Sequence, residues 1–241
     1  MRSLRVLLIV VVILGVLFVI VDRVAVHFAE GQVADRLRSS EHLASTPDVS
    51  IEGFPFLTQL AGGELDDVEV GIETLEAPTG TAGRTLRIDD LHAEMKGVRF
   101  SGDYSSATAD SATGTATIAY DELLKAVKPE PTDIGLGVTA QVVGLSDGGN
   151  GKIKVAVKVS VLPTPVSVLG SVSVKNDRLQ VHADSLPRLL PQQLVDSRVR
   201  EITDFQQAVD TLPGGIRLDS VRAEKDGVHI TVKGSHVRLA G

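Results

Sequence analysis

The feature that most limits how this chain can fold is an uninterrupted apolar run near its N-terminus. Residues 6–21, VLLIVVVILGVLFVIV, contain no polar side chain. A helix over this run is about 24 Å long at 1.5 Å per residue, slightly shorter than a hydrocarbon core. Leu4 and residues 24–26 lengthen the apolar span if the Arg5 side chain extends outward. The run therefore predicts either a transmembrane anchor or a signal peptide.

The flanking residues favour an anchor that is not cleaved. A signal peptidase site needs small residues, and the positions two residues before Ala25 and Ala29 hold Arg23 and His27. Basic residues precede the run, which leaves the bulk of the chain outside the cytoplasm. We expect a single-pass anchor over residues 1–26 and an extracytoplasmic domain over residues 27–241, on the periplasmic or cell-envelope side.

Composition excludes several classes of function. The net charge is −7, and the chain has no Trp and two Tyr. Nucleic-acid binding needs a basic face and stacking aromatics, so it is not expected, and neither is a sugar-stacking module. The absence of cysteine excludes disulfides, thiolate catalysis, Cys-ligated zinc and lipid acylation at cysteine.

Most of the chain after residue 48 has the period-2 pattern of strands. The clearest example is 152–161, in which Ile153, Val155, Val157, Val159 and Val161 alternate with polar or small residues. This pattern is typical of a half-buried antiparallel strand. A second alternating strand is predicted over residues 134–142, with the hairpin loop SDGGNG between the two. The small and polar residues of 105–119 predict an edge strand or a flexible loop.

Three segments have helical character. The stripe that follows the apolar run, up to residue 37, predicts a helix that packs on the domain or forms a rigid stalk. Residues 120–127 predict a short helix before Pro129, and residues 187–212 predict a one-sided amphipathic helix. The fold class is therefore α+β, with a large antiparallel sheet and a few helices against one face.

An internal similarity relates residues 86–100 to residues 216–230, LRIDDLHAEMKGVRF and IRLDSVRAEKDGVHI. In both segments the apolar alternation slips by one residue in the middle. A slip of one residue reverses the two faces of a strand unless a bulge absorbs it, so we expect a β-bulge in both. Gly97 and Gly227 are then expected in hairpin turns. The similarity is explained equally by a duplication or by convergence of two bulged hairpins.

No catalytic motif is present, and no enzyme activity, cofactor or metal site is expected. The six histidines have no metal-ligand spacing. Carboxylates cluster at residues 64–69 and 89–94, without the order of a calcium loop, and we interpret them as solvated surfaces.

Binding of an apolar ligand fits the composition better. Hydrophobic residues make up 43% of the chain, yet aromatics make up only 3%. A sheet face of aliphatic side chains suits acyl chains, which need no hydrogen bonds, although the same pattern describes an ordinary core. As a groove wall we consider Val155, Val157 and Val159. The lysines of the opposite face, Lys152, Lys154 and Lys158, suit anionic headgroups or a solvated surface.

Four segments of the chain are distinctive: the anchor, the stretch VSIEGFPFLTQLAGGELDDVEV at 49–70, the segment LPRLLPQQL at 186–194 and the C-terminal segment from residue 212. Together they resemble the actinobacterial LmeA-like family of phospholipid-binding envelope proteins. The resemblance covers about residues 20–241. It implies a β-rich, tubular lipid-binding fold and binding of phospholipids such as phosphatidylinositol species. It also implies a role in the maintenance of envelope lipids or lipoglycans.

The Gly-Phe-Pro-Phe stretch carries the most specific part of this resemblance. Pro55 prevents the stretch from continuing as a central strand, so its apolar side chains point in several directions. Phe54, Phe56, Leu57 and Leu60 form either the lip of an apolar groove that dips toward the membrane or a plug at the end of the core. The expected function is a membrane-anchored phospholipid-binding or lipid-transfer protein. The alternative is a non-catalytic structural or interaction module of an envelope-glycan assembly complex.

Overall fold

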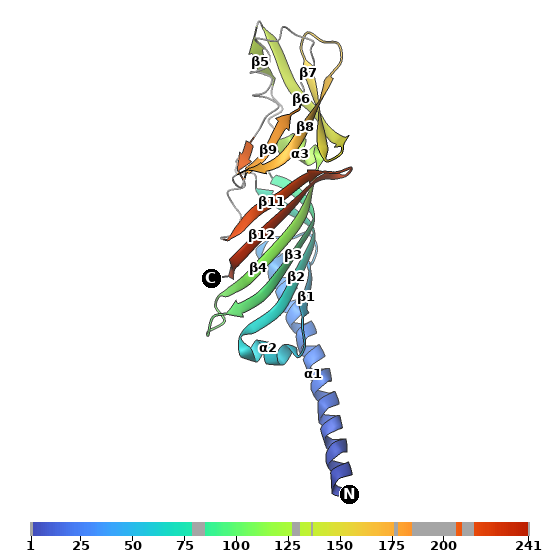
Figure 1. Ribbon diagram of the computed structural model, residues 1–241, viewed down its shortest axis with the longest axis vertical. Helices are drawn as coiled ribbons and strands as arrows, with labels where there is room; N and C mark the ends of the chain where they lie inside the picture. Colours follow the sequence, from blue (N-terminus) through green and yellow to red (C-terminus); the bar gives the residue numbers. More distant parts are fainter. Residues whose placement is uncertain are drawn as a thin grey trace.

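The computed structural model describes residues 2–78, 85–126, 131–135, 137–175, 178–184, 206–208 and 215–240. In these ranges the chain forms two antiparallel six-stranded sheets that lie end to end, with a long N-terminal helix projecting from one end (Figure 1). The helices are α1 (Arg2–Ser40), α2 (Phe56–Gly62) and α3 (Tyr120–Ala126). The α+β class predicted from the sequence is confirmed, with the strands divided between two sheets.

We call the sheet beside α1 the proximal sheet and the other the distal sheet. The proximal sheet contains, in spatial order, β1 (Asp48–Glu52), β2 (Glu64–Pro78), β3 (Thr85–Phe100), β4 (Ala107–Ala119), β12 (Gly227–Ala240) and β11 (Ile216–Ala223). The distal sheet contains, in spatial order, β10 (Gln206–Ala208), β9 (Arg178–Ala183), β8 (Val166–Lys175), β7 (Lys152–Val159), β6 (Val138–Gly149) and β5 (Thr132–Gly135). The proximal sheet is strongly curled, and α1 lies against its concave side (Figure 1).

The two halves of α1 have different surroundings. From Leu4 to Val21 the apolar side chains are exposed, and among the described residues α1 is the one helix long and apolar enough to cross a membrane. After that point one face is buried, because Val26 and Ala34 pack on the proximal sheet. The second half thus packs on the domain, as the first of the two sequence hypotheses states.

Both predicted β-bulges are present. The register between β3 and β4 shifts between Asp89 and His92, and the register between β11 and β12 shifts between Leu218 and Ser220. Asp90 adopts a positive φ of 50° at the first of these. The bulges keep the apolar side chains on one face although the sequence alternation slips.

The prediction that Gly97 lies in a hairpin turn is wrong. Gly97 lies inside β3 with a φ of +60°, and a Cβ there would be 2.6 Å from an Asp110 carboxylate oxygen. This conformation lets Met95 and Val98, three residues apart, both pack in the concave core. Gly227 does close a turn, because Glu224 donates its backbone N–H to the Gly227 carbonyl at 2.8 Å.

Two strand predictions need correction. Residues 107–119 are neither an edge strand nor a loop, since β4 pairs with β3 on one side and with β12 on the other. The strand predicted over 134–142 is instead the hairpin of β5 and β6, in which Gly135 pairs with Val138. The positive φ values of Gly135 and Gly137 provide this tight reversal, which alternation alone does not reveal.

Two predicted helices have different outcomes. The helix predicted at 120–127 is confirmed as α3. The helix predicted over 187–212 lies almost entirely outside the described residues, and the three of its residues that are described form strand β10.

Candidate functional site

The concave face of the proximal sheet is apolar across its whole width. Paired residues of an antiparallel sheet lie on the same face, so the register identifies complete rows. One row contains Ile51, Val68, Met95, Ala112, Gly234 and Ile216. The next row on this face contains Val49, Val70, Ala93, Gly114, Val232 and Leu218. Every position in both rows is apolar or glycine.

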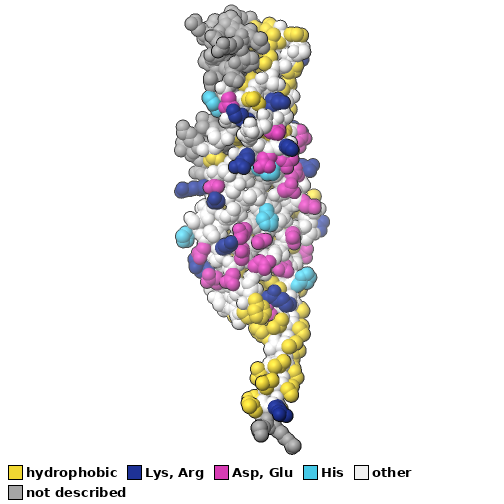
Figure 2. Space-filling view, turned by 45° about the vertical axis from the view of Figure 1, so that its right-hand side comes forward, with side chains coloured by type: hydrophobic (Ala, Val, Ile, Leu, Met, Phe, Trp, Pro, Cys, Tyr) yellow, Lys and Arg dark blue, Asp and Glu magenta, His cyan; other side chains and the backbone are white. Residues whose placement is uncertain are grey.

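The row between these two lies on the opposite face and is polar throughout. It contains Ser50, Glu69, Glu94, Thr113, Lys233 and Arg217. Figure 2 shows acidic side chains gathered over the middle of the molecule, where this sheet lies, and apolar side chains along the projecting part of α1. The proximal sheet is therefore solvated outside and apolar inside.

Helix α1 covers only one side of the concave face. Its residues Ala34 and Leu37 pack with Val49, Val70 and Met95, which belong to β1, β2 and β3. Its earlier turns pack at the end of the sheet beside α2. The middle of the face is thus not among the side chains that α1 buries.

We call the middle of the concave face, beyond the side chains that α1 buries, the central strip. It contains Ala93, Ala112, Gly114, Ala116 and Val232, all half-buried. In the described part of the chain, none of these five belongs to a buried hydrophobic cluster. At Gly114 a Cβ would lie only 2.8 Å from a Val232 methyl, so the Val232 side chain occupies the space above this glycine. The small side chains of β3 and β4, with Val232 of β12 over Gly114, thus form an apolar floor.

The strip is closed at the end toward the distal sheet. There Ile118, Ala223 and Val228 are buried with distal-sheet residues such as Ile153 and Val155 in one core. At the opposite end the concave face reaches α2 and the projecting helix (Figure 1). At this end too the face is buried, because Val98 and Ala109 pack with Val26 of α1 and Phe56 of α2.

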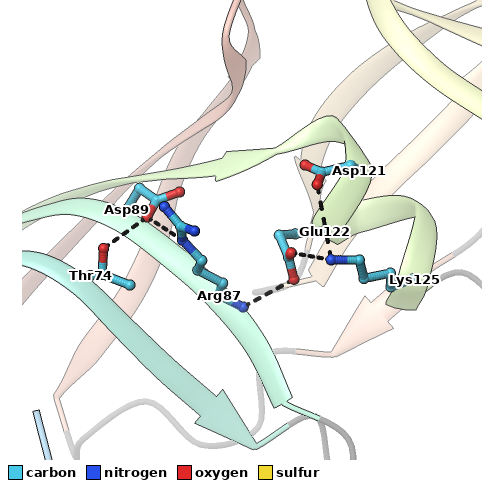
Figure 3. A network of polar contacts seen from close by, with 6 residues as sticks. All are labelled: Thr74, Arg87, Asp89, Asp121, Glu122 and Lys125. Atoms are coloured by element: carbon cyan, nitrogen blue, oxygen red, sulfur yellow. Dashed lines mark hydrogen bonds and ion pairs between the residues drawn. The ribbon is translucent and has the colours of Figure 1, made fainter. Parts of the chain in front are cut away.

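A polar network holds the junction between the sheets (Figure 3). Asp89 accepts hydrogen bonds from Thr74 at 3.1 Å and from the Arg87 side chain at 2.8 Å. The bond to Asp89 raises the pKa of Arg87 above its usual value. The Glu122 carboxylate accepts the Arg87 backbone N–H at 3.5 Å and pairs with Lys125 within α3. These contacts tie α3, which leads into the distal sheet, to β3.

Tyr120 makes a second tie at the junction. Its hydroxyl donates to the Glu224 carbonyl at 2.6 Å, which connects α3 to the β11–β12 hairpin. Burial, with smaller contributions from Asp147 and Asp226, raises the pKa of Tyr120 to about 12. The hydroxyl therefore remains a donor at physiological pH.

The residues proposed as a groove lip have different surroundings. Phe56 is 3% exposed and packs with Val26 and Leu65, the position that the plug hypothesis describes. Phe54 is 57% exposed, and Leu57 and Leu60 are half-buried beside the same core. Contact of these side chains with a ligand stays a prediction.

The proposed groove wall lies in the distal sheet. Val155, Val157 and Val159 are all buried in the core that joins the sheets. On the other face Lys152 pairs with Asp184 at 2.8 Å, and Lys154 and Lys158 are exposed.

Carboxylates do converge at two places in the described residues. Asp67, Glu69 and Glu94 lie on the outer face, and Glu224, Asp226 and His229 lie at the β11–β12 hairpin. At the first, the Lys96 ammonium lies 2.7 Å from Glu94, and burial together with the Glu94 charge raises the pKa of Asp67. At the second, the hydrogen bond from His229 lowers the pKa of Asp226. Lys96 adjoins the first group and His229 belongs to the second, and both groups lie apart from the concave face.

An open depression of about 760 Å³ lies beside the last turns of α1. Its lining includes the apolar Val33 and Leu37 and the polar Asp35, Arg36, Ser39 and Ser40. Leu37 also packs on the concave core, so the depression adjoins the covered side of that face.

Sequence reasoning missed the central strip. Its signal is the run 107–119, in which Ala112, Gly114 and Ala116 alternate with serine and threonine. Such a pattern predicts a strand with one apolar face of small side chains. Small side chains in the middle of a sheet leave room for a ligand or another packed element. Recognising this required β4 to be placed at the centre of the sheet.

A family model described as LmeA-like phospholipid-binding matches residues 20–233. No curated protein and no solved structure matches the chain. The matched range includes the sheet-bound half of α1 and every residue of the central strip.

Proposed function

Because this chain belongs to the LmeA-like phospholipid-binding family, we propose that it holds phospholipid acyl chains on the central strip while α1 anchors it in a membrane. The observation that carries the proposal is the apolar concave face, which α1 covers on one side only. An acyl chain placed there gains about 0.8 kcal/mol for each methylene removed from water. Binding of this kind requires burial and no bond breaking.

The path to the strip starts at the anchor. The exposed apolar half of α1 continues directly into the half that packs on the concave face. Phe54, Leu57 and Leu60 lie beside this transition, so we assign them to the entrance, and the buried Phe56 supports them from the core. An acyl chain that leaves the bilayer along α1 meets these apolar side chains first.

The finer parts of the proposal follow from the N-terminus and the family. Arg2 and Arg5 precede the span, which favours an extracytoplasmic domain of residues 27–241 on an anchor of residues 1–26. Such a domain serves envelope lipid or lipoglycan maintenance, either by holding a phospholipid such as a phosphatidylinositol species or by transferring it.

Photocrosslinking tests the location of the lipid. The full chain is reconstituted in bilayers that contain a phospholipid with a diazirine on its acyl chain, irradiated, digested and analysed by mass spectrometry. We expect crosslinks on peptides of β3 and β4 that contain Ala93 and Ala112. Crosslinks confined to the span before residue 28 would contradict the proposal and favour the alternative of a non-catalytic interaction module.

A further inference from the structure

The end of the domain beside the anchor exposes a small apolar surface, which we call the seat. It contains Val24, Phe28 and Phe54, which are 65%, 69% and 57% exposed. Val24 and Phe28 follow Val21 at spacings of three and four residues, so they continue the apolar surface of the span along one side of α1. The Arg23 guanidinium lies 5.4 Å from the centre of the Phe54 ring, a cation–π arrangement.

The buried carboxylate of Asp22 fixes the seat to the anchor. Asp22 is fully buried, directly after the apolar run. It accepts the Leu57 backbone N–H at 2.9 Å and an Arg23 N–H at 2.8 Å. Arg23 also donates to the Gly53 carbonyl at 3.4 Å. Since Pro55 gives α2 no side-chain cap of its own, Asp22 of α1 satisfies the start of that helix.

A second tie eight residues later makes the connection rigid. Glu30 of α1 accepts the Ile51 backbone N–H at 3.0 Å, on the edge strand β1. Two ties about two turns apart on one helix leave no hinge between the anchor and the domain. The height of α2 relative to the span is therefore set by the helix itself.

The rise of α1 between Arg5 and Asp22 is too small to hold the domain clear of a bilayer. From Arg5 to Asp22 the helix rises about 26 Å at 1.5 Å per residue, whereas a hydrocarbon core is about 30 Å thick. If Arg5 lies at one interface, Asp22 and the start of α2 lie at the level of the other. A tilt of the helix shortens the projected length and moves the seat deeper.

We propose that the seat is embedded in the headgroup layer of the membrane that α1 spans, with Phe54 in contact with lipid and Asp22 as the positioning residue. The inference rests on the proposed anchoring of α1 and not on binding of lipid at the central strip. The surface is continuous with the span, and the half-exposed guanidinium of Arg23, although paired with Asp22, has further N–H donors that suit phospholipid phosphates. The seat thus holds the entrance of the concave face against the bilayer.

The chain has no tryptophan, so a single introduced one reports depth. Phe54→Trp is made in the full chain and reconstituted in phosphatidylcholine bilayers with brominated acyl chains, which quench tryptophan on contact. Phe18→Trp, within the span, reports anchoring, and Val161→Trp, 58% exposed after β7 in the distal sheet, reports the solvent. We expect Phe54→Trp to be quenched at least half as strongly as Phe18→Trp, and Val161→Trp to be unaffected.

The outcomes separate this inference from the proposed function. If Phe18→Trp is not quenched, α1 does not anchor the chain in the bilayer, and both proposals are wrong. If Phe18→Trp is quenched but Phe54→Trp is as unaffected as Val161→Trp, the anchor is supported and the membrane contact of the seat is wrong. That result would favour a protein partner for the exposed aromatic side chains. Quenching at both positions supports the seat.

Two further variants test how the seat is positioned. Asp22→Asn is expected to reduce the quenching of Phe54→Trp at least twofold and to leave the quenching of Phe18→Trp unchanged. If Phe54→Trp is quenched equally with and without Asp22→Asn, Asp22 is not the positioning residue. Insertion of four leucines between Leu14 and Gly15 leaves the domain untouched and raises it by about 6 Å. This insertion is expected to reduce quenching of Phe54→Trp, and unchanged quenching would contradict the length argument even if Asp22→Asn fails to fold.

Discussion

The two sheets carry the same alternation of apolar and polar residues, yet they use their apolar faces differently. In the distal sheet Ile153, Val155 and Val157 are at most 4% exposed. In the proximal sheet Ala112 and Ala116 occupy equivalent alternating positions and remain half-buried. The difference teaches that alternation identifies an apolar face, whereas side-chain size and the elements packed above it decide whether that face is a closed core or a binding surface.

The strongest test of this comparison is a cavity in the closed core. Ile153→Ala removes methyl groups that are 2% exposed, and we expect a loss of about 2–5 kcal/mol in the free energy of unfolding. Denaturant unfolding in mild detergent measures it, with the exposed Lys154→Ala on the opposite face as the control. A loss below about 1 kcal/mol would show that this face is not closed.

The matching test fills the open face. Ala112→Leu places a larger side chain on the central strip, and we expect phospholipid crosslinking in β3 and β4 to fall at least about tenfold, equivalent to 1.4 kcal/mol. Its control is Thr113→Leu, the next residue of β4, which lies in the outer polar row. Equal crosslinking in both variants would contradict the assignment of the two faces.

A smaller effect is expected where the sheets meet. Tyr120→Phe removes the hydrogen bond to the Glu224 carbonyl, and we expect a loss of about 1 kcal/mol in the free energy of unfolding. Because the folded state raises the pKa of Tyr120 to about 12, its contribution is complete below pH 10 and is lost as the pH rises from 10 to 12. Absorbance of tyrosinate during an alkaline titration measures the pKa, and a value near 10 would refute the buried bond.

The smallest effect is expected at the far hairpin of the proximal sheet. Asp103 accepts hydrogen bonds from the hydroxyls of Ser101 and Ser105 and from the Ser105 backbone, which lower its pKa to about 2. A lowered folded pKa stabilises the hairpin above the unfolded value near 4, and this stabilisation is lost as the pH falls from 4 to 2. Asp103→Asn should flatten that part of the acid unfolding curve. An unchanged curve would show that the carboxylate adds no stability.

Sequence patterns predicted much of the local structure for identifiable reasons. The apolar run before Asp22 allowed only a membrane-directed helix, and slips in alternation located both bulges. Gly97 was wrongly predicted to lie in a turn. Its positive φ instead changes the face of a strand, and a glycine in the sequence does not distinguish these two roles. The hairpin at Gly135–Val138 was missed because the alternation passes through it unchanged.

The sequence by itself determined that a membrane-directed helix precedes an antiparallel, aliphatic domain, because helix and strand periods are local properties of the chain. Only the tertiary structure decided that β4 is central and that its small residues form the floor of the concave face. It also decided that the buried carboxylate of Asp22 connects α1 to α2. Each of these depends on pairing between segments far apart in the chain. Pairing partners are chosen by packing and register, which no local pattern contains.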